Sequence, residues 1–424
     1  MNDERQTFIR TITGKITKED ILKNINEIDS QISKQLFPKI TTLPFEHIIQ
    51  NLCNYLNKTQ YIEPKENITL SNLSTITSYP FSLFKNLYLD ADVALASNEL
   101  SYLKKYNTNL ICDVTNVING QNKEKLKEIS NLSKIQICFG YSVDKEKVKD
   151  LKKYSNDIQY EIIYGFDNLV PSFIGEEIIQ SKFPSSEYEE KVYEMILNDI
   201  VNQYNIPIFF KLNGQQKFYD TNTILKWVKT KKIANKKKIV FSISISDYDD
   251  DDLDKIRLLC NDLLLNGYSL ILSIYDCDVS KNKNEEKLDL YFNKSKAKFI
   301  NSILIENRKF IQNIMLSNNI NFKIQLKYFG GFGYENLFEN YYDIIIKDLN
   351  QEEINYIFYL NLLDILDYWK ELEKYKKKVK MIKCEYCGKE MEEDNPDIFR
   401  KFDKNFCSFQ CLKKYLSVNS NKFS

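Results

Sequence analysis

The stretch IMLSNNINFKIQLKYFGGFGYENLF, residues 314–338, decides the fold class, because its apolar run FKIQLKYF (322–329) leads into a glycine-rich turn. That run is the last of a series that starts near residue 87 and alternates with polar, amphipathic stretches. The other runs are NLYLDADVAL (86–95), NLICDVTNVI (109–118), KIQICFGY (134–141), IQYEIIYGF (158–166), IPIFFKL (206–212), KKIVFSISI (237–245) and YSLILSIY (268–275). Several are continuous and β-branched, as expected for parallel strands buried on both faces. The series predicts an α/β protein, and its number of runs fits a closed (β/α)8 (TIM) barrel better than two small sheets.

The stretches between the runs have helical character. KEKVKDLKKYSND (145–157), SEYEEKVYEMILNDIVNQYN (186–205) and the whole of residues 352–380 are expected to be helices. The acidic run at 247–254 is expected at a helix N-terminus, where carboxylates favour the helix dipole, rather than in a calcium loop. The basic stretch at 226–238 is expected to be a solvated helix and turn rather than a phosphate site. The chain thus divides into a barrel (1–375), a basic helical linker (376–383) and a cysteine-rich module (384–424).

Charge and hydropathy exclude several classes of protein. Lys plus Arg and Asp plus Glu both number 59 in the 424 residues, which argues against a nucleic-acid-coating protein or a polybasic membrane binder. The sequence has no run of ~18 apolar residues, and its first ten residues lack the apolar stretch of a signal peptide. We therefore expect a cytoplasmic protein that does not bind a membrane.

The cysteines fall into two groups. Five lie singly among apolar residues, where cysteine usually acts as a small hydrophobe: Cys53, Cys112, Cys138, Cys260 and Cys277. The other four crowd near the C-terminus in metal-ligand spacing. This pattern is typical of a reducing compartment and not of a disulfide framework.

The C-terminal cysteines predict one structural zinc ion. Cys384 and Cys387 form C-x2-C before Gly388, and Cys407 and Cys411 form C-x3-C, which would place both sulfurs on the first turn of a helix. Four thiolates give a closed tetrahedral Zn²⁺ site without an open position for substrate. The arrangement resembles a treble-clef zinc finger of the FCS type. So small a module needs the metal to fold, with a miniature core that we expect to be formed by Phe406, Phe409 and Tyr415.

A set of motifs, in chain order, resembles the phosphotriesterase family of the amidohydrolase superfamily. RTITGKIT (10–17) resembles the N-terminal hairpin of that family, and GGFGY (330–334) is a distinctive feature of one branch. The strands that carry the resemblance are TLPFEHII (42–49, strand one), NLICDVTNVI (two), KIQICFGYSVD (134–144, three), FIGEEII (173–179, four), IPIFFKLNG (206–214, five), KKIVFSISISDYDDDDLD (237–254, six) and residues 314–338 (eight). The resemblance spans about residues 8–370 and implies a barrel of the phosphotriesterase type.

The resemblance also implies a binuclear metal site, of which this chain keeps little. The family uses H-x-H on strand one, a lysine or glutamate on strand four, a histidine on each of strands five and six, and an aspartate on strand eight. Here the corresponding residues are Phe45 and His47, Glu176, Lys211, Ile243 or Ser244, and Asn319. The chain contains one histidine in all, so a multi-histidine metal centre is excluded. Barrel-bound metal is therefore doubtful.

The substitutions suggest what replaces the metal. Lys211 would place an ammonium near Glu176, and pairing would offset the cost of burying both charges. Phe45 would fill part of the vacated volume. Residues that could serve other chemistry are Asp113, Asp276, Tyr334 and Asn336, all expected near the barrel mouth.

Three functional hypotheses follow. The first is a non-catalytic barrel, a pseudoenzyme that binds a small ligand or a protein partner, with the zinc finger as an interaction module. The second is a residual metal-dependent hydrolase of phosphoesters, lactones or amides that uses His47 and Glu176. The third is a component of an assembly system docked by its finger, and homo-oligomerisation stays open in each case. Loss of metal ligands favours the first and third, whereas the retained GGFGY motif keeps the second open.

Overall fold

The computed structural model describes residues 8–23, 38–56, 65–89, 92–144, 150–165, 169–179, 183–212, 217–245, 250–275, 293–367, 381–392, 398–401 and 404–418. Its contacts divide the chain into two compact units, Met1–Tyr368 and Trp369–Ser424. Among the described helices, none combines the length and the apolar character that crossing a membrane requires.

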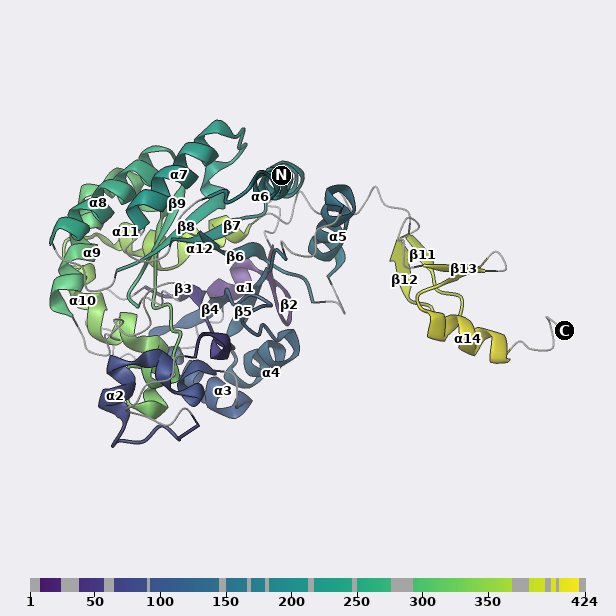
Figure 1. Ribbon diagram of the computed structural model, residues 1–424, viewed down its shortest axis with the longest axis horizontal. Coiled ribbons are helices and arrows are strands. Elements are labelled where there is room, and N and C mark those ends of the chain that lie inside the picture. Colours follow the sequence, from purple (N-terminus) through teal and green to yellow (C-terminus); the bar gives the residue numbers. More distant parts are fainter. Residues whose placement is uncertain are drawn as a thin grey trace. The chain divides into compact units, whose positions relative to one another are not determined.

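The first unit is built on a single parallel sheet of eight strands in sequential order (Figure 1). Its strands are β3 (Thr41–Glu46), β4 (Thr108–Asp113), β5 (Gln136–Tyr141), β6 (Phe173–Ile179), β7 (Ile208–Leu212), β8 (Ile239–Ser244), β9 (Ser269–Ser273) and β10 (Ile314–Ser317). Both faces of these strands are mostly buried, as their continuous apolar sequences require. The predicted (β/α)8 barrel is confirmed.

Side chains close the barrel between its first and last strands. The hydroxyl of Ser317 accepts a hydrogen bond from the backbone N–H of Phe45 at 3.0 Å and lies 2.8 Å from Oε1 of Glu46. Glu46 also accepts hydrogen bonds from the backbone N–H groups of Asn318 (2.7 Å) and Ile320 (3.1 Å). The Glu46 carboxylate therefore fastens β3 to the end of β10.

Helices follow the strands and lie outside the sheet (Figure 1). They include α2 (Leu73–Ser78), α3 (Val93–Ser101), α4 (Lys123–Ser133), α5 (Leu151–Tyr164), α6 (Glu187–Met195), α7 (Lys217–Thr230), α8 (Asp250–Leu265), α9 (Lys294–Glu306), α10 (Tyr342–Ile345), α11 (Gln351–Asn355) and α12 (Asn361–Leu366). Residues Ile196–Asn202, Leu337–Tyr341 and Tyr356–Leu360 form π-helical turns. The helix α8 begins at Asp250, within the acidic run, as expected for carboxylates at a helix N-terminus.

The N-terminal end of the barrel is covered by the predicted hairpin, β1 (Phe8–Thr11) and β2 (Gly14–Thr17), which leads into α1 (Lys18–Lys23). The backbone carbonyl of Arg10 accepts hydrogen bonds from Ser172 Oγ at 2.8 Å and Cys138 Sγ at 3.0 Å. Lys238, expected in a solvated turn, is instead buried, so that prediction is wrong for this residue. Its ammonium donates to the carbonyl oxygens of Asp364 (3.1 Å) and Ile365 (2.5 Å), where it caps the C-terminus of α12.

Three of the apolar runs are not strands. IQYEIIYGF lies largely in α5, because Ile158 and Ile162 are spaced by one helical turn and both are buried. NLYLDADVAL contains the end of a 3-10 turn and the start of α3, whose first turn is capped by Asp92. FKIQLKYF forms two 3-10 turns, and the eighth strand is the IMLS segment before it.

Side chains stabilise the non-strand conformation of FKIQLKYF. Glu99 accepts hydrogen bonds from the backbone N–H groups of Lys327 (3.0 Å) and Tyr328 (2.8 Å), and Asn86 accepts one from Ile324 at 3.0 Å. These bonds satisfy buried backbone groups that a strand would have paired with a neighbour.

The second unit is a small module of two hairpins and a helix. It comprises β11 (Met381–Lys383), β12 (Glu390–Glu392), β13 (Phe399–Lys401), β14 (Lys404–Phe406) and α14 (Phe409–Val418). Residues 381–383, expected in a helical linker, form a strand, and the described part of the helix expected at 352–380 ends at Leu366. Residues 368–380 lie outside the described residues.

Candidate functional site

Lys211, the last but one residue of β7, meets Glu176 of β6, whose backbone N–H donates to the carbonyl oxygen of Val114 just past the end of β4. The Nζ atom of Lys211 lies 3.3 Å from Oε1 of Glu176, and their side chains are 4% and 1% exposed. Burial raises the pKa of Glu176, and the neighbouring ammonium of Lys211 opposes that shift. The predicted buried ion pair is present.

His47, directly after β3, lies near the same carboxylate oxygen. Its Nε2 atom is 3.7 Å from Oε1 of Glu176, and its Nδ1 atom lies 3.2 Å from Oγ1 of Thr115. Burial and the positive charge of Lys211 lower the pKa of His47, so the imidazole is neutral at pH 7. The same oxygen of Glu176 therefore lies close to both groups, 3.3 Å from the Lys211 ammonium and 3.7 Å from the His47 ring nitrogen.

Asn319 joins the site from the segment after β10. Its side-chain amide donates to Oγ of Ser244 at 3.2 Å and to the carbonyl oxygen of Tyr275 at 3.3 Å. The residue has a φ of 63°, a left-handed conformation that asparagine tolerates better than most residues. Two positions that resemble metal-ligand positions, Ser244 and Asn319, are thus linked by a hydrogen bond between neutral groups.

Aromatic rings pack next to the buried polar residues of the site. Phe45 is fully buried, with its ring edge-on to His47 at 6.2 Å between centroids and stacked on Phe209 at 6.5 Å. Phe173 stacks on the other side of Phe209 at 4.5 Å. The ring of Phe45 therefore stands against the imidazole, as expected if phenylalanine occupies part of the volume that the first histidine of H-x-H would take.

The other candidates near the mouth have structural roles. The Asp113 carboxylate accepts hydrogen bonds from the backbone N–H groups of Ile48 (2.7 Å) and Thr115 (3.1 Å). The hydroxyl of Tyr334 donates to the carbonyl oxygen of His47 at 2.7 Å, and Asn336 donates to the hydroxyl of Tyr275 at 2.7 Å. These contacts hold the segment that carries His47. Asp276 and Cys277 lie outside the described residues.

Sequence reasoning missed Glu46, a buried carboxylate that accepts hydrogen bonds from Ser317, Asn318 and Ile320. Burial raises the pKa of Glu46 to about 7, against the opposing hydrogen bonds from Ser317 and from the backbone of Ile320 and Asn318. Burial likewise raises the pKa of Asp113 to about 7. An ionisable residue inside the apolar strand TLPFEH was the signal that could have identified Glu46.

The donor set at the mouth does not fit a binuclear metal centre. Of the six positions that the resemblance implies, only His47 and Glu176 keep a ligand type, and Glu176 is ion-paired with Lys211. A metal bound there would have to lie close to an ammonium group. The residues present therefore do not support chemistry through two bridged metals.

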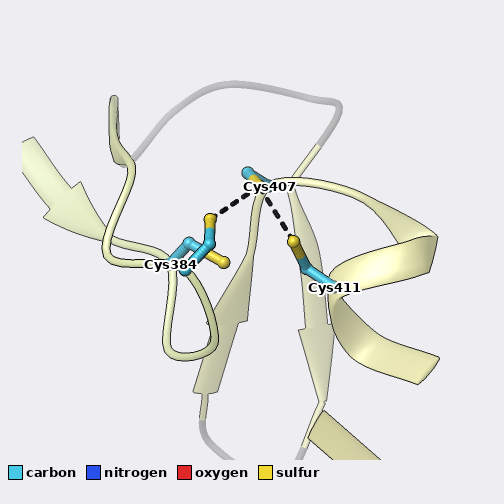
Figure 2. A group of neighbouring side chains, drawn as sticks. Cys384, Cys407 and Cys411 are labelled. Carbon is cyan, nitrogen blue, oxygen red and sulfur yellow. Dashed lines mark hydrogen bonds between the residues drawn. The ribbon is translucent and has the colours of Figure 1, made fainter. Parts of the chain in front are cut away.

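The C-terminal cysteines, by contrast, converge on one point (Figure 2). The sulfur atoms of Cys384, Cys387, Cys407 and Cys411 all lie within 4.8 Å of one another. Tetrahedral Zn–S bonds of about 2.3 Å need sulfur atoms roughly 3.8 Å apart, so the set fits zinc. Burial alone would raise the pKa of Cys384, but the backbone N–H groups of Cys387, Cys407 and Tyr386 lower it to about 6, which favours the thiolate that a metal requires.

The local structure explains this convergence. Gly388 has a φ of 73° and donates its N–H to the carbonyl oxygen of Cys384 at 2.9 Å, which closes the predicted tight turn. Cys407 precedes the helix rather than lying in its first turn, while Cys411 lies in α14. Phe406 is buried and packs against Tyr415 at 5.1 Å, but Phe409 is 53% exposed, so its expected place in the core is wrong.

Comparison with known proteins defines the barrel further. No family model matches the chain, and no curated protein sequence matches it either. Several solved structures do match the chain. A resiniferatoxin-binding protein from Rhodobacter sphaeroides is 18% identical, with a TM-score of 0.67 over 85% of this chain and 95% of that protein.

Two further structures resemble the barrel. The phosphotriesterase homology protein from Escherichia coli, complexed with phosphate, is 17% identical, with a TM-score of 0.54 over 77% of this chain and 98% of its own. A lactonase from Listeria monocytogenes is 15% identical, with a TM-score of 0.53 over 85% and 99% of the two chains. At such identities the likeness concerns architecture. The chain therefore has the fold of the phosphotriesterase-like (β/α)8 barrels, followed by a module whose four cysteines can hold a metal ion such as zinc.

Proposed function

We propose that the barrel is a metal-free binding protein, a pseudoenzyme that recognises a small ligand or a protein partner at its mouth. The observation that carries this proposal is the ion pair between Lys211 and Glu176, buried where the fold family places metal. In this proposal, the cysteine module carries one structural zinc ion and serves as an interaction module.

Electrostatics argue against a divalent cation on Glu176. Two unit positive charges 4 Å apart repel by about 4 kcal/mol at an effective dielectric constant of 20, and a dication doubles that figure. The single additional ligand type, His47, does not offset such repulsion, because tight zinc sites use three or four protein ligands. Lys211 thus supplies the positive charge in place of the metal.

The fold is compatible with binding as well as hydrolysis. One similar structure is described as a resiniferatoxin-binding protein and another as a lactonase, so barrels of this architecture serve more than one role. Ligands of such barrels bind at the carboxyl ends of the strands, where Lys211 and Glu176 lie.

The test is metal content per chain in the full-length protein and in its Cys384→Ser/Cys407→Ser variant. We expect one zinc ion per chain in the wild type and none in the variant. Cys53→Ser is the matched control, since Cys53 lies far from the sulfur cluster in the sequence and should leave the zinc unchanged. Metal that persists in the double variant would refute the proposed metal-free barrel.

A residual hydrolase is the second candidate, favoured by one observation. Nε2 of His47 and Oε1 of Glu176 are buried and lie 3.7 Å apart, as two ligands of a weakly held cation would. In that case Lys211→Met should raise metal affinity and hydrolysis of phosphotriesters or lactones. The double variant Lys211→Met/Glu176→Gln, which also removes the carboxylate, should lose this increase in metal affinity and hydrolysis.

We further propose a cytoplasmic location. Cys112, Cys138 and Cys260 are free and buried, which suits a reducing compartment. Mass spectrometry of unreduced protein, with thiol alkylation under denaturing conditions, should find these thiols unmodified.

A further inference from the structure

Three polar side chains from distant parts of the sequence converge at the barrel mouth. The ammonium of Lys211 lies 3.3 Å from Oε1 of Glu176, and Nε2 of His47 lies 3.7 Å from that same oxygen. All three side chains are buried. An amine therefore stands beside one proton acceptor and near a second.

Other buried lysines of the barrel have a different environment. Nζ of Lys238 donates to the carbonyl oxygens of Asp364 and Ile365, at the end of α12. Nζ of Lys296 donates to the carbonyl oxygen of Ile274 at 3.1 Å. These carbonyl oxygens cannot take up a proton, and burial lowers the pKa of Lys238 to about 8, which makes Lys238 a stringent control for amine reactivity. Lys211 differs because a buried carboxylate oxygen lies 3.3 Å from its Nζ atom.

We propose that Lys211 captures a small aldehyde or ketone as an imine at the barrel mouth. This inference rests on the proposed metal-free barrel and names the chemical class of its ligand. A desolvated primary amine is activated toward carbonyl compounds, the adjacent carboxylate can take up its proton, and burial limits the water that would reverse the reaction.

The step balances without any further reagent. The ammonium of Lys211 passes one proton to Glu176, and the free nitrogen pair bonds to the carbonyl carbon while the carbonyl π pair moves to oxygen. A second nitrogen proton reaches that oxygen, with Nε2 of His47 as its carrier. Glu176 then returns its proton, the C–O bond breaks, and water leaves. The product is a protonated imine, whose positive charge Glu176 still balances.

The experiment uses the full-length protein with pyruvate and with glycolaldehyde, each followed by borohydride. Reduction converts the imine to a stable secondary amine, which adds the mass of the carbonyl compound less one oxygen atom. Peptide mapping should find the adduct on Lys211 at a level at least about tenfold above that on Lys238 or Lys296, as expected for an activated amine. Equal labelling of the three lysines would overturn the proposal.

Two variants separate capture from folding. Lys211→Arg keeps a cation beside Glu176 but cannot form an imine, so the adduct should vanish while the thermal midpoint stays near that of the wild type. Glu176→Gln should slow capture about tenfold, since proton transfer of this kind typically contributes at least that much. Should Lys211→Arg fail to fold, the position of the adduct in the wild type decides by itself.

Metal analysis of the same samples distinguishes the two proposals. A metal-free barrel without an adduct on Lys211 refutes only the imine. A barrel that retains metal after loss of the finger's zinc refutes the metal-free binding protein.

Discussion

The barrel mouth and the cysteine module are both places where the chain could hold metal, and they differ in how their ligands are supplied. In the module, all four cysteines come from one short stretch, residues 384–411, and their sulfurs lie together. In the barrel, the corresponding positions are scattered from His47 to Asn319 and meet only when the sheet closes. A site built from one short segment forms or is lost as a whole. A site built from separate strands can lose its ligands one at a time while the fold persists.

The two regions also differ in what holds them together. The barrel has an extensive core of buried apolar residues, which can stabilise its fold without a metal ion. The module has a cluster of only a few buried residues, among them Phe406 and Leu412. We therefore expect metal to be dispensable for the fold of the barrel and essential for the fold of the module.

The largest expected effect follows from removing a ligand in the module. Cys407→Ser should abolish zinc binding and unfold the module, because structural zinc contributes about 10–16 kcal/mol to the folding of such units. Zinc content and limited proteolysis would measure this. The urea midpoint of the barrel should not change, and a shared loss of stability would contradict the division into two units.

The next effect concerns the ion pair at the barrel mouth. Lys211→Met leaves Glu176 buried without its partner and should lower the free energy of unfolding of the barrel by about 3–5 kcal/mol. Urea denaturation is the measurement. The double variant Lys211→Met/Glu176→Met should recover most of this loss, since neither charge is then buried. If Lys211→Met were as stable as the wild type, the ion pair would not stabilise the barrel as described.

A smaller effect should depend on pH. Burial raises the pKa of Glu46 from 4.5 to about 7, so the native state holds this proton more tightly than the unfolded chain. The resulting stability is fully present below about pH 4.5 and is lost as the pH rises through 7.

Glu46→Gln should remove this contribution. Between pH 5 and 8, the free energy of unfolding of the variant should fall by roughly 1–3 kcal/mol less than that of the wild type. Asp113→Asn is the matched variant, because burial raises the pKa of Asp113 to about 7 as well. A steeper decline of the free energy of unfolding with pH in Glu46→Gln than in the wild type would contradict the expected contribution of Glu46.

The smallest effect is expected at the opposite end of the barrel. Lys238→Met removes the ammonium that caps the last carbonyls of α12 and should cost about 1–3 kcal/mol, the penalty for buried acceptors left unpaired. Thermal unfolding would detect it. Zinc content should be unaffected, and a loss of zinc would show coupling between the two units.

Much of this architecture could be predicted from the sequence. Continuous apolar runs predicted five of the strands, because a strand buried on both faces has no polar positions. Family motifs placed β3, β6 and β10. The runs at 158–166 and 322–329 were wrongly predicted to be strands, because short apolar segments of helix, turn and strand have similar sequences.

The sequence by itself determined the group of four cysteines in metal-ligand spacing and the single histidine, because these depend on residue type and on short spacings. It also predicted that Lys211 and Glu176 would pair. Only the tertiary structure decided that Glu46 closes the barrel, that Asp113 and Tyr334 hold the segment of His47, and that Lys238 is buried. These roles join residues from distant strands and loops, and such contacts exist only once the sheet has curled and brought its ends together.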